Sequence, residues 1–254
     1  GTESQPFIRL RRQQTNGYLQ LPRGIPYWNN DKQAQILRLG YIKPEVLSWS
    51  PRIILLHNFL SLEGSSPPSP ENFNSGGCKD RKDHARSILP LNLNPMVNIS
   101  LYHLIPLESR VMSEQALAIE KRISVYSQVP VENGELMQVL RYEKNQYYRP
   151  HHDYFSDTFN LKRGGQRIAT MLMYLGDNVE GGETHFPSAG SDECSCGGKL
   201  TKGLCVKPIK GNAVLFWSMG LDGQSDPDSV HGGCPVLAGE KWSATKWMRQ
   251  SVHV

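Results

Sequence analysis

Two histidines and an aspartate have the residue types and the spacing of a metal site. His151 and Asp153 lie two residues apart, and His231 follows further along the chain. Two neutral imidazoles and one carboxylate hold Fe(II) on one face and leave its other face open to substrate and oxygen. The set therefore predicts a 2-His-1-carboxylate iron site. Lys241, ten residues beyond His231, would let an anionic co-substrate bind beside the metal.

His-x-Asp pairs are common by chance, and most are surface residues or hydrogen-bonded pairs. On an extended strand, residues i and i+2 point to the same face, so the side chains of His151 and Asp153 can reach one metal while His152 points away. A sheet can fold His231 back onto that pair, which favours the metal site. For Lys241 taken alone, a solvated lysine at a turn is the simpler interpretation.

The segment 241–248 predicts a strand whose two faces differ. One face combines a cation, two hydroxyls and an aromatic ring, which is typical of a polar pocket: Lys241, Ser243, Thr245 and Trp247. The other face predicts core apart from one lysine: Trp242, Ala244, Lys246 and Met248. Tyr142, on a predicted strand, could place its hydroxyl inside a barrel. Thr184 would be the first inward hydroxyl of a strand that follows a Gly-Gly turn.

The elements that must position these residues are mostly short strands. Apolar runs predict strands, and Gly/Asp/Pro clusters between them predict turns. The predicted strands are 49–60, with its apolar stretch at 52–57, and 138–142, 167–175, 205–209, 213–217 and 241–248. Helices are predicted at about 32–39 and at 113–127. Many short strands with turns between them predict a mainly β fold with flanking helices, closed or sandwiched as in a jelly roll.

Size and composition set the broad class of the protein. The chain has 254 residues, of which 38% are hydrophobic and 20% charged, and this length allows one sizeable core or two small domains. No apolar run approaches the roughly 18 residues that span a bilayer as a helix. The chain begins at Gly1 rather than Met, so we expect a trimmed fragment in which no targeting segment is visible.

The net charge of +4 has its source in the N-terminal part of the chain. Residues 1–52 carry eight Lys/Arg against three Asp/Glu. No aromatic interleaving and no nucleic-acid motif accompany this charge. A solvated basic arm is therefore favoured, and no nucleic-acid partner is expected.

Five cysteines leave at least one unpaired unless a bridge forms between chains: Cys78, Cys194, Cys196, Cys205 and Cys234. Three of them lie in one Gly/Ser/Asp-rich loop. Their Cys-x-Cys-x8-Cys spacing is not that of a standard zinc finger, and no histidine lies inside it. A loop-closing disulfide such as Cys194–Cys205, in an oxidising compartment, is favoured over zinc.

Residues 135–250 closely resemble the catalytic domain of plant and algal prolyl 4-hydroxylases, which depend on iron and 2-oxoglutarate. Order and spacing agree for six runs: QVLRY (138–142), PHHDYF (150–155), GGQRIATMLMYL (164–175), GGET (181–184), VHGGCP (230–235) and KWSATKW (241–247). The resemblance extends to 43–61 and 118–123. It implies a double-stranded β-helix, which is a jelly roll flanked by helices.

The resemblance also implies roles for nine residues. Three would bind Fe(II): His151, Asp153 and His231. One would pair with the distal carboxylate of 2-oxoglutarate, helped by two hydroxyls: Lys241 with Thr184 and Tyr142. Three would face a peptide substrate: Tyr148, Arg167 and Trp247.

The reaction that the resemblance implies is hydroxylation of peptidyl proline to 4-hydroxyproline in proline-rich secreted or cell-wall proteins. It is coupled to oxidative decarboxylation of 2-oxoglutarate to succinate and CO2. O2 is the second co-substrate, and L-ascorbate would rescue iron that is oxidised without turnover. Family members usually lie in the lumen of the endoplasmic reticulum or Golgi, often behind one N-terminal membrane anchor, and the same placement is expected for this chain.

Residues 62–112 depart from the family. There the resemblance would place a cysteine-bearing helix, a strand pair and a loop that closes over the peptide, and none of these motifs is present. A frame-shifted or mis-spliced segment is our hypothesis for this interval. The expected division is a basic arm over 1–45 and a catalytic domain over 46–254, with the jelly-roll core at about 135–250.

Two alternatives to a prolyl hydroxylase remain at this point. One is a related enzyme that hydroxylates another peptidyl residue, such as lysine, because the metal set does not decide the substrate. The other is a protein that binds iron and 2-oxoglutarate without turnover, because residues 62–112 no longer form the substrate lid. The oligomeric state is left open.

Overall fold

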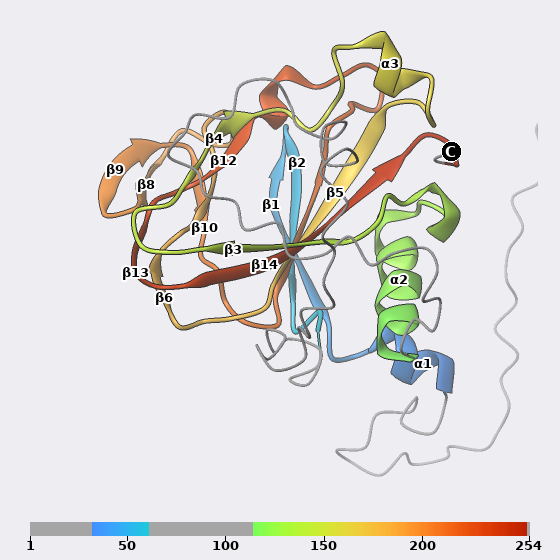
Figure 1. The fold of residues 1–254 in the computed structure, drawn as a ribbon, viewed down its shortest axis with the longest axis horizontal. Helices are drawn as coiled ribbons and strands as arrows, with labels where there is room; N and C mark the ends of the chain where they lie inside the picture. The colour runs from blue at the N-terminus through green and yellow to red at the C-terminus, as the bar shows by residue number, and fades with distance from the viewer. Residues whose placement is uncertain (1–31, 61–113, 253–254) are drawn as a thin grey trace, which may run out of the picture.

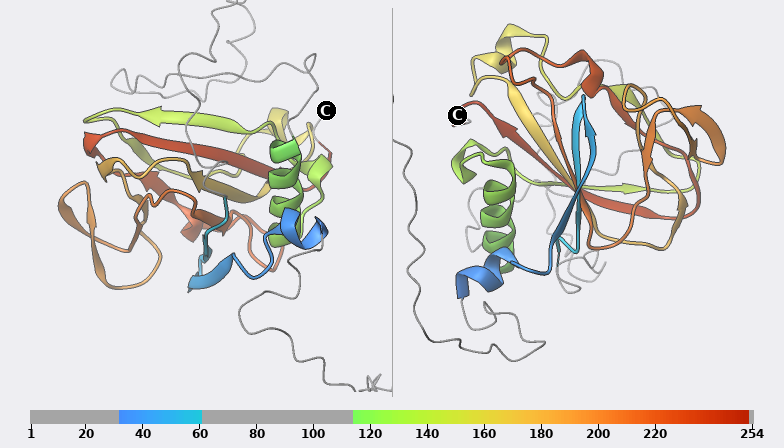
Figure 2. Two further views of the ribbon diagram at one scale, coloured as in Figure 1. Left: turned by 90° about the horizontal axis from the view of Figure 1, so that it is seen from below. Right: turned by 180° about the vertical axis from the view of Figure 1, so that it is seen from behind.

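A computed structural model describes residues 32–60 and 114–252 of the chain. Two antiparallel sheets form the body of the fold, and helices flank the larger sheet (Figures 1 and 2). The predicted mainly β fold with flanking helices is confirmed. The atypical segment 62–112, Cys78 and most of the expected basic arm lie outside the described residues.

The two longest helices lie together at one end of the molecule. α1 (Lys32–Leu37) packs against α2 (Glu114–Ser127). At the opposite end lies a hairpin made of β8 (Glu193–Cys196) and β9 (Lys199–Lys202) (Figures 1 and 2). The remaining helices are short: α3 (Thr158–Leu161) and the 3₁₀ helices η3 (Val131–Asn133) and η4 (Pro227–Ser229).

The larger sheet has six strands in the order β1-β2-β11-β5-β14-β3. In chain order they are β1 (Lys43–Trp49), β2 (Arg52–His57), β3 (Gln138–Tyr142), β5 (Arg167–Tyr174), β11 (Ala213–Trp217) and β14 (Lys241–Arg249). All their pairings are antiparallel. Five of these six strands were predicted from the sequence. The bounds of four are confirmed to within one residue, whereas the strand predicted at 49–60 is shorter and covers only Arg52–His57.

The smaller sheet has the order β10-β7-β12-β4. Its strands are β4 (Tyr148–His151), β7 (Thr184–Phe186), β10 (Leu204–Val206) and β12 (His231–Gly233), and a separate pair joins β6 (Val179–Gly181) to β13 (Val236–Gly239). The strand predicted at 205–209 is too long. It ends at Val206, and Pro208, which has no N–H to donate to a ladder, lies beyond that end.

β1 lies across the expected start of the catalytic domain. The boundary between residues 45 and 46 falls inside this strand, which pairs with β2 from Lys43 to Trp49. Most side chains of β1 are exposed, so the strand lacks the apolar alternation that predicts one. As an edge strand it also tolerates Pro44. Among the described residues, the folded body therefore begins before residue 46.

Alternation along the larger sheet divides the apolar side chains between two cores. Directly paired residues share a face, so Ala244 and Met173 point toward the helices, whereas Ser243 and Tyr174 point toward the smaller sheet. The helix-side core includes Ile123, Met171, Met173, Leu215 and Met248. The core between the sheets includes Ile53, Tyr174, Phe186, Val214 and Phe216. The two faces predicted for residues 241–248 are confirmed.

Lys246 is the exception on the core face of β14, and α2 accounts for it. Its Nζ lies 2.6 Å from Oε1 of Glu120, and both side chains are buried. Ile119 and Ile123 of the same helix pack against the sheet. The ion pair therefore anchors the helix at a defined place on an otherwise apolar face.

Removing Glu120 should destabilise the fold strongly. Because Glu120→Ala leaves Lys246 buried without its partner, we expect a loss of about 3–5 kcal/mol in the free energy of unfolding. The double change Glu120→Leu/Lys246→Met should restore most of that loss, since an apolar pair replaces a desolvated ion pair. Urea denaturation measures both. Lys121→Ala, at an exposed position of α2, is the control and should change stability by less than about 0.5 kcal/mol.

Candidate metal centre and lysine site

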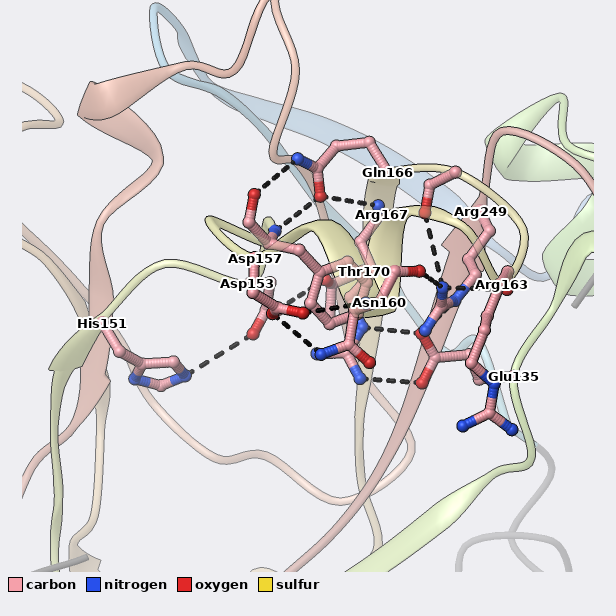
Figure 3. A network of polar contacts seen from close by, with 12 residues as sticks. Glu135, His151, Asp153, Asp157, Asn160, Arg163, Gln166, Arg167, Thr170 and Arg249 are labelled. Atoms are coloured by element: carbon pink, nitrogen blue, oxygen red, sulfur yellow. Dashed lines mark hydrogen bonds and ion pairs between the residues drawn. The ribbon is translucent and has the colours of Figure 1, made fainter. Parts of the chain in front are cut away.

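The three predicted metal ligands come from two neighbouring strands. His151 ends β4, His231 begins β12, and the two are direct cross-strand partners. Asp153 follows just past the end of β4. One oxygen of its carboxylate lies 3.5 Å from Nε2 of His151 and the other lies 3.6 Å from Nε2 of His231. Figure 3 shows the ring of His151 pointing toward Asp153. The fold thus brings the three residues together.

A backbone carbonyl engages the Nδ1 atom of each imidazole. Nδ1 of His151 lies 2.8 Å from the carbonyl oxygen of Arg149, and Nδ1 of His231 lies 3.1 Å from that of Ser229. A carbonyl oxygen only accepts hydrogen bonds, so each Nδ1 carries a proton and donates it. In its neutral form each ring therefore keeps the lone pair on Nε2 for a metal, and a hydrogen bond from the other ring nitrogen is the support that metal-binding histidines usually receive.

Asp153 is buried and ionised. Oγ1 of Thr170 donates to its Oδ2 at 2.6 Å. Burial by itself would raise the pKa of Asp153, but His231, His151 and Arg167 lower it well below its usual range. Burial also lowers the pKa of His231 to about 4, against the raising effect of the carboxylate. At neutral pH the centre offers a carboxylate and a neutral His231.

This set of donor atoms fits Fe(II). The three ligand atoms lie within 4.8 Å of one another. Two imidazole nitrogens and one carboxylate oxygen on one side of an ion are the facial triad of non-haem iron oxygenases, which leaves positions open for other ligands. A second group, His185 with Cys194 and Cys205, does not fit a metal because its two cysteines are joined in a disulfide.

Aromatic rings line the metal centre. The rings of Phe216 and Phe186 lie 4.5 and 5.8 Å from the ring of His231, centre to centre. The ring of Tyr148 meets the ring of His151 edge to face at 4.2 Å. An apolar shell of this kind limits access of water and fixes the orientation of the imidazoles.

Lys241 lies buried beside two tyrosine rings, and we call Lys241, Tyr142, Tyr174 and Thr184 the lysine site. Nζ of Lys241 lies 5.7 Å from the ring centre of Tyr142 and 5.8 Å from that of Tyr174. Within the described part of the chain, no hydrogen bond or ion pair engages this Nζ. Burial lowers the pKa of Lys241 to about 8, against the raising effect of Glu183. A buried ammonium with no partner is suited to an incoming carboxylate.

Thr184 and Tyr174 complete the lysine site. Thr184 begins β7, is buried, and has its Oγ1 2.8 Å from the hydroxyl oxygen of Tyr174. Burial raises the pKa of Tyr174, so its hydroxyl stays protonated. Tyr174 is absent from the sequence prediction. The signal that could have found it is alternation along β5, because Tyr174 lies on the same face as Thr170.

The three residues predicted to face a peptide lie near the metal ligands. The guanidinium of Arg167 lies 4.1 Å from the ring centre of Trp247 and 4.7 Å from that of Phe155. Trp247 pairs directly with Thr170, the residue that donates to Asp153. Tyr148 packs on His151 as described above. The fold thus gathers all nine predicted site residues around the metal centre and the lysine site.

A carboxylate that the sequence prediction missed holds Arg167 in place. Both oxygens of Glu135 accept hydrogen bonds from Arg167, at 2.7 Å each, and one of them also accepts from Nε of Arg249 at 2.7 Å (Figure 3). Arg249 in turn donates to backbone carbonyls around α3, those of Asn160, Arg163 and Gly165. Burial would raise the pKa of Glu135, but the two arginines lower it.

Two disulfides tie the β8–β9 hairpin to the smaller sheet. Cys194 pairs with Cys205, as predicted, and Cys196 pairs with Cys234, which was not predicted. Cys234 lies three residues after His231, so the second bridge connects the hairpin to the segment that leaves the metal centre. Its partners are 38 residues apart in sequence, and spacing alone does not select that pairing.

Comparisons with a family model and with known proteins agree on one family. A family model described as the 2OG-Fe(II) oxygenase superfamily matches residues 137–249. Prolyl 4-hydroxylase 1 of Arabidopsis thaliana is 57% identical over 256 aligned residues, which cover 96% of this chain and 84% of that protein. Probable prolyl 4-hydroxylase 3 of the same plant is 46% identical over 224 residues, covering 80% of this chain and 71% of the relative.

A solved structure also resembles this fold. It is a viral collagen prolyl hydroxylase from Paramecium Bursaria Chlorella virus-1 in complex with 2OG. The match has a TM-score of 0.53 and 25% sequence identity, and it covers 78% of this chain and 95% of the viral chain. The agreement extends to most of the viral protein, so it concerns the whole jelly roll rather than one motif.

Proposed function

This chain belongs to the prolyl 4-hydroxylases of the 2OG-Fe(II) oxygenase superfamily, and we propose that it hydroxylates peptidyl proline to 4-hydroxyproline in proline-rich secreted proteins. Its cofactor is Fe(II), and its co-substrates are 2-oxoglutarate and O2. The observation that carries the proposal is the triad of His151, Asp153 and His231 with both Nε2 atoms available, beside a buried lysine that lacks a partner among the described residues.

Bound iron and 2-oxoglutarate supply the oxidising chemistry, in which 2-oxoglutarate and O2 yield succinate, CO2 and one oxygen atom for the proline C4–H bond. The chain positions the reactants. Lys241 pairs with the distal carboxylate of 2-oxoglutarate, and the hydroxyls of Thr184 and Tyr142 donate to the same group. Thr170 fixes the Asp153 carboxylate through its hydrogen bond. Phe186 and Phe216 keep water away from one side of the centre.

The peptide is positioned by Tyr148, Arg167 and Trp247 in this proposal. Arg167 lies over the ring of Trp247, and its charge is balanced by Glu135. An arginine held in this way can donate to peptide carbonyls without a large loss of side-chain entropy. Their positions beside the metal ligands support a peptide that enters next to Asp153 and His151.

One assay tests the proposed function against its alternatives. The purified chain is incubated with Fe(II), ascorbate, 2-oxoglutarate and a proline-rich peptide, and succinate and peptide mass are both measured. Succinate release that depends on the peptide, with hydroxyl added to proline, supports a prolyl hydroxylase. Hydroxyl added to another residue supports the related hydroxylase. Binding of metal and 2-oxoglutarate without turnover supports the second alternative, a binding protein in which residues 62–112 do not form the substrate lid.

Ascorbate dependence and cellular placement are further parts of the proposal. We propose that ascorbate sustains turnover, and that the chain acts in the lumen of the endoplasmic reticulum or Golgi as part of a type II membrane protein. The two disulfides support an oxidising compartment. In the described ranges, no helix has the length and apolar character needed to cross a membrane.

Affinity for 2-oxoglutarate should fall at alkaline pH. Lys241 is charged below its pKa of about 8 and neutral above it. Because 2-oxoglutarate pairs with the charged form, its affinity should change little below about pH 7 and fall by up to about tenfold per unit above about pH 8. Calorimetric titration of Mn(II)-loaded protein without oxygen measures this. A constant affinity up to about pH 9 would contradict the role of Lys241.

A further inference from the structure

Of the three iron ligands, Asp153 alone lies outside the strand ladders. β4 ends at His151 and β12 begins at His231, so both imidazoles stand on paired strands. Within the described chain, residues 153–155 form no hydrogen bond between backbone groups. Thr170 holds the carboxylate of Asp153, but other groups must fix the path of its main chain.

Gln166 supplies that support through its buried side chain. Its carboxamide forms a closed pair of hydrogen bonds with the backbone of Phe155, two residues after Asp153. Oε1 of Gln166 accepts from the N–H of Phe155, and Nε2 donates to its carbonyl oxygen at 2.9 Å (Figure 3). A neighbouring strand would exchange the same two bonds with one residue of an antiparallel ladder. The chain just beyond Asp153 therefore has a fixed direction without a strand beside it.

The same carboxamide also bonds to the residue predicted to face the peptide. Oε1 of Gln166 accepts from the N–H of Arg167 at 3.2 Å. One oxygen thus bonds to both ends of the segment that carries α3, next to an iron ligand at one end and at the start of β5 at the other. The ring of Phe155 adds a second link, because the guanidiniums of Arg167 and Arg249 lie 4.7 and 4.5 Å from its centre.

The end of β14 holds Gln166 in turn. The N–H of Gln166 donates to Oε1 of Gln250 at 2.8 Å, and its carbonyl oxygen accepts from the N–H of Gln250 at 3.0 Å. Gly165 has positive φ, and a Cβ there would lie 2.7 Å from the same Oε1, so glycine lets the side chain of Gln250 approach. The backbone of Gln166 is therefore anchored, which keeps its carboxamide in place for Phe155.

We propose that Gln166 is a positioning residue for the reaction: it sets the place of Asp153 at the metal through Phe155, and it sets the place of Arg167 at the peptide directly. The metal half stands on the geometry of the triad, and the peptide half rests on the proposed function and deepens it. Because one carboxamide serves both, its removal should loosen the iron ligand and the peptide arginine together. Loss of a purely structural bond would lower stability and leave both sites unaltered in the folded protein.

Two substitutions remove the contacts of the carboxamide. Gln166→Met keeps an unbranched side chain of similar length and loses all of its hydrogen bonds. Gln166→Asn keeps a polar amide at this buried place but is one methylene shorter, so it provides the test where the methionine variant does not fold. Gln224→Met, among the exposed residues 221–225, is the matched control. Melting curves establish which variants are folded.

Three measurements follow the two sites separately. Absorption spectra of the Co(II)-loaded protein report on ligand geometry, anaerobic titration gives the dissociation constant of Fe(II), and succinate release gives the KM for a proline-rich peptide. For Gln166→Met we expect an altered Co(II) spectrum and about a three- to tenfold rise in the Fe(II) dissociation constant, less than for a direct partner of a ligand because Gln166 acts through the backbone. The peptide KM should rise by about threefold or more, since Arg167 is less well placed.

Gln166→Asn should change the same three quantities in the same direction, and Gln224→Met should change none of them. A wild-type Fe(II) dissociation constant, or a wild-type peptide KM, in a folded Gln166 variant would overturn the inference. A wild-type protein without peptide-dependent turnover would instead overturn the proposed function and the peptide half with it. The Co(II) spectrum and the Fe(II) titration still decide the metal half in that case.

Discussion

His231→Ala should bind no iron at physiological concentrations and should show no turnover. The variant loses one of three ligands, and it leaves the ionised Asp153 facing only His151. Loss of a group that merely supports a ligand typically lowers metal affinity by roughly 10- to 100-fold, so loss of a ligand should exceed about 100-fold. Anaerobic Fe(II) titration and peptide-dependent succinate release measure the two effects.

Two further variants show whether the loss comes from the metal centre. Thr170→Val removes the hydrogen bond to Asp153 while keeping the shape of the side chain, and it should weaken iron binding by about 10- to 100-fold. His152→Ala should leave iron binding unchanged, because His152 bonds to the carbonyl of Pro227 and not to the triad. Wild-type iron affinity in a folded His231→Ala protein would refute the assignment of this ligand.

Lys241→Met should lose 2-oxoglutarate while keeping iron. Truncating one partner of a buried charge pair costs about 2–5 kcal/mol, which corresponds to a roughly 30-fold or greater rise in the dissociation constant. Methionine keeps an unbranched, apolar stem of similar length, so it fills the space between the rings of Tyr142 and Tyr174. Titration of 2-oxoglutarate into the Mn(II)-loaded variant measures the loss.

The same substitution should have the opposite effect on stability. In the ligand-free wild type, a buried ammonium lacks a hydrogen-bonded partner within the described chain, which destabilises the fold. We therefore expect the melting temperature of Lys241→Met to equal or exceed that of wild type without ligand. Added 2-oxoglutarate should raise the melting temperature of wild type only. Lys199→Met, at an exposed position of β9, should bind 2-oxoglutarate as wild type does. Unaltered binding in Lys241→Met would refute the ion pair.

The alternation of residue types along single strands predicted where those strands lie and which side chains share a face. Alternation along residues 241–248 correctly separated the face of Lys241 and Trp247 from that of Ala244 and Met248, because a strand has a period of two. Residues of β5 and β3 that pair directly with β14 lie on the same face as their partners, so the two faces of β14 continue across these strands. The metal ligands were predicted from the i, i+2 spacing of His151 and Asp153 and from the family resemblance, and not because any element was foreseen for His231.

Local sequence periodicity did not predict features that depend on residues far apart in the chain. Lys246 looked anomalous on its strand because its partner Glu120 lies on a helix 126 positions earlier in the chain. Strands such as β12 and β6 have three residues each, too few for a period to be read. Arg167 faces Trp247 although regular alternation would point it elsewhere, because the register shifts between Met248 and Arg249.

The pairing of His231 with His151 across β12 and β4 makes the iron site a property of strand register. A slip of one residue between these strands would turn one imidazole to the opposite face, and no rotation of its side chain could recover the lost ligand. The effect of a one-residue insertion on iron binding should therefore depend on where in the chain it is made. One extra residue among the exposed residues 221–225 should be tolerated. One extra residue directly before His231, between Val230 and His231, would shift His231 against His151 and should eliminate iron binding in a protein that still folds.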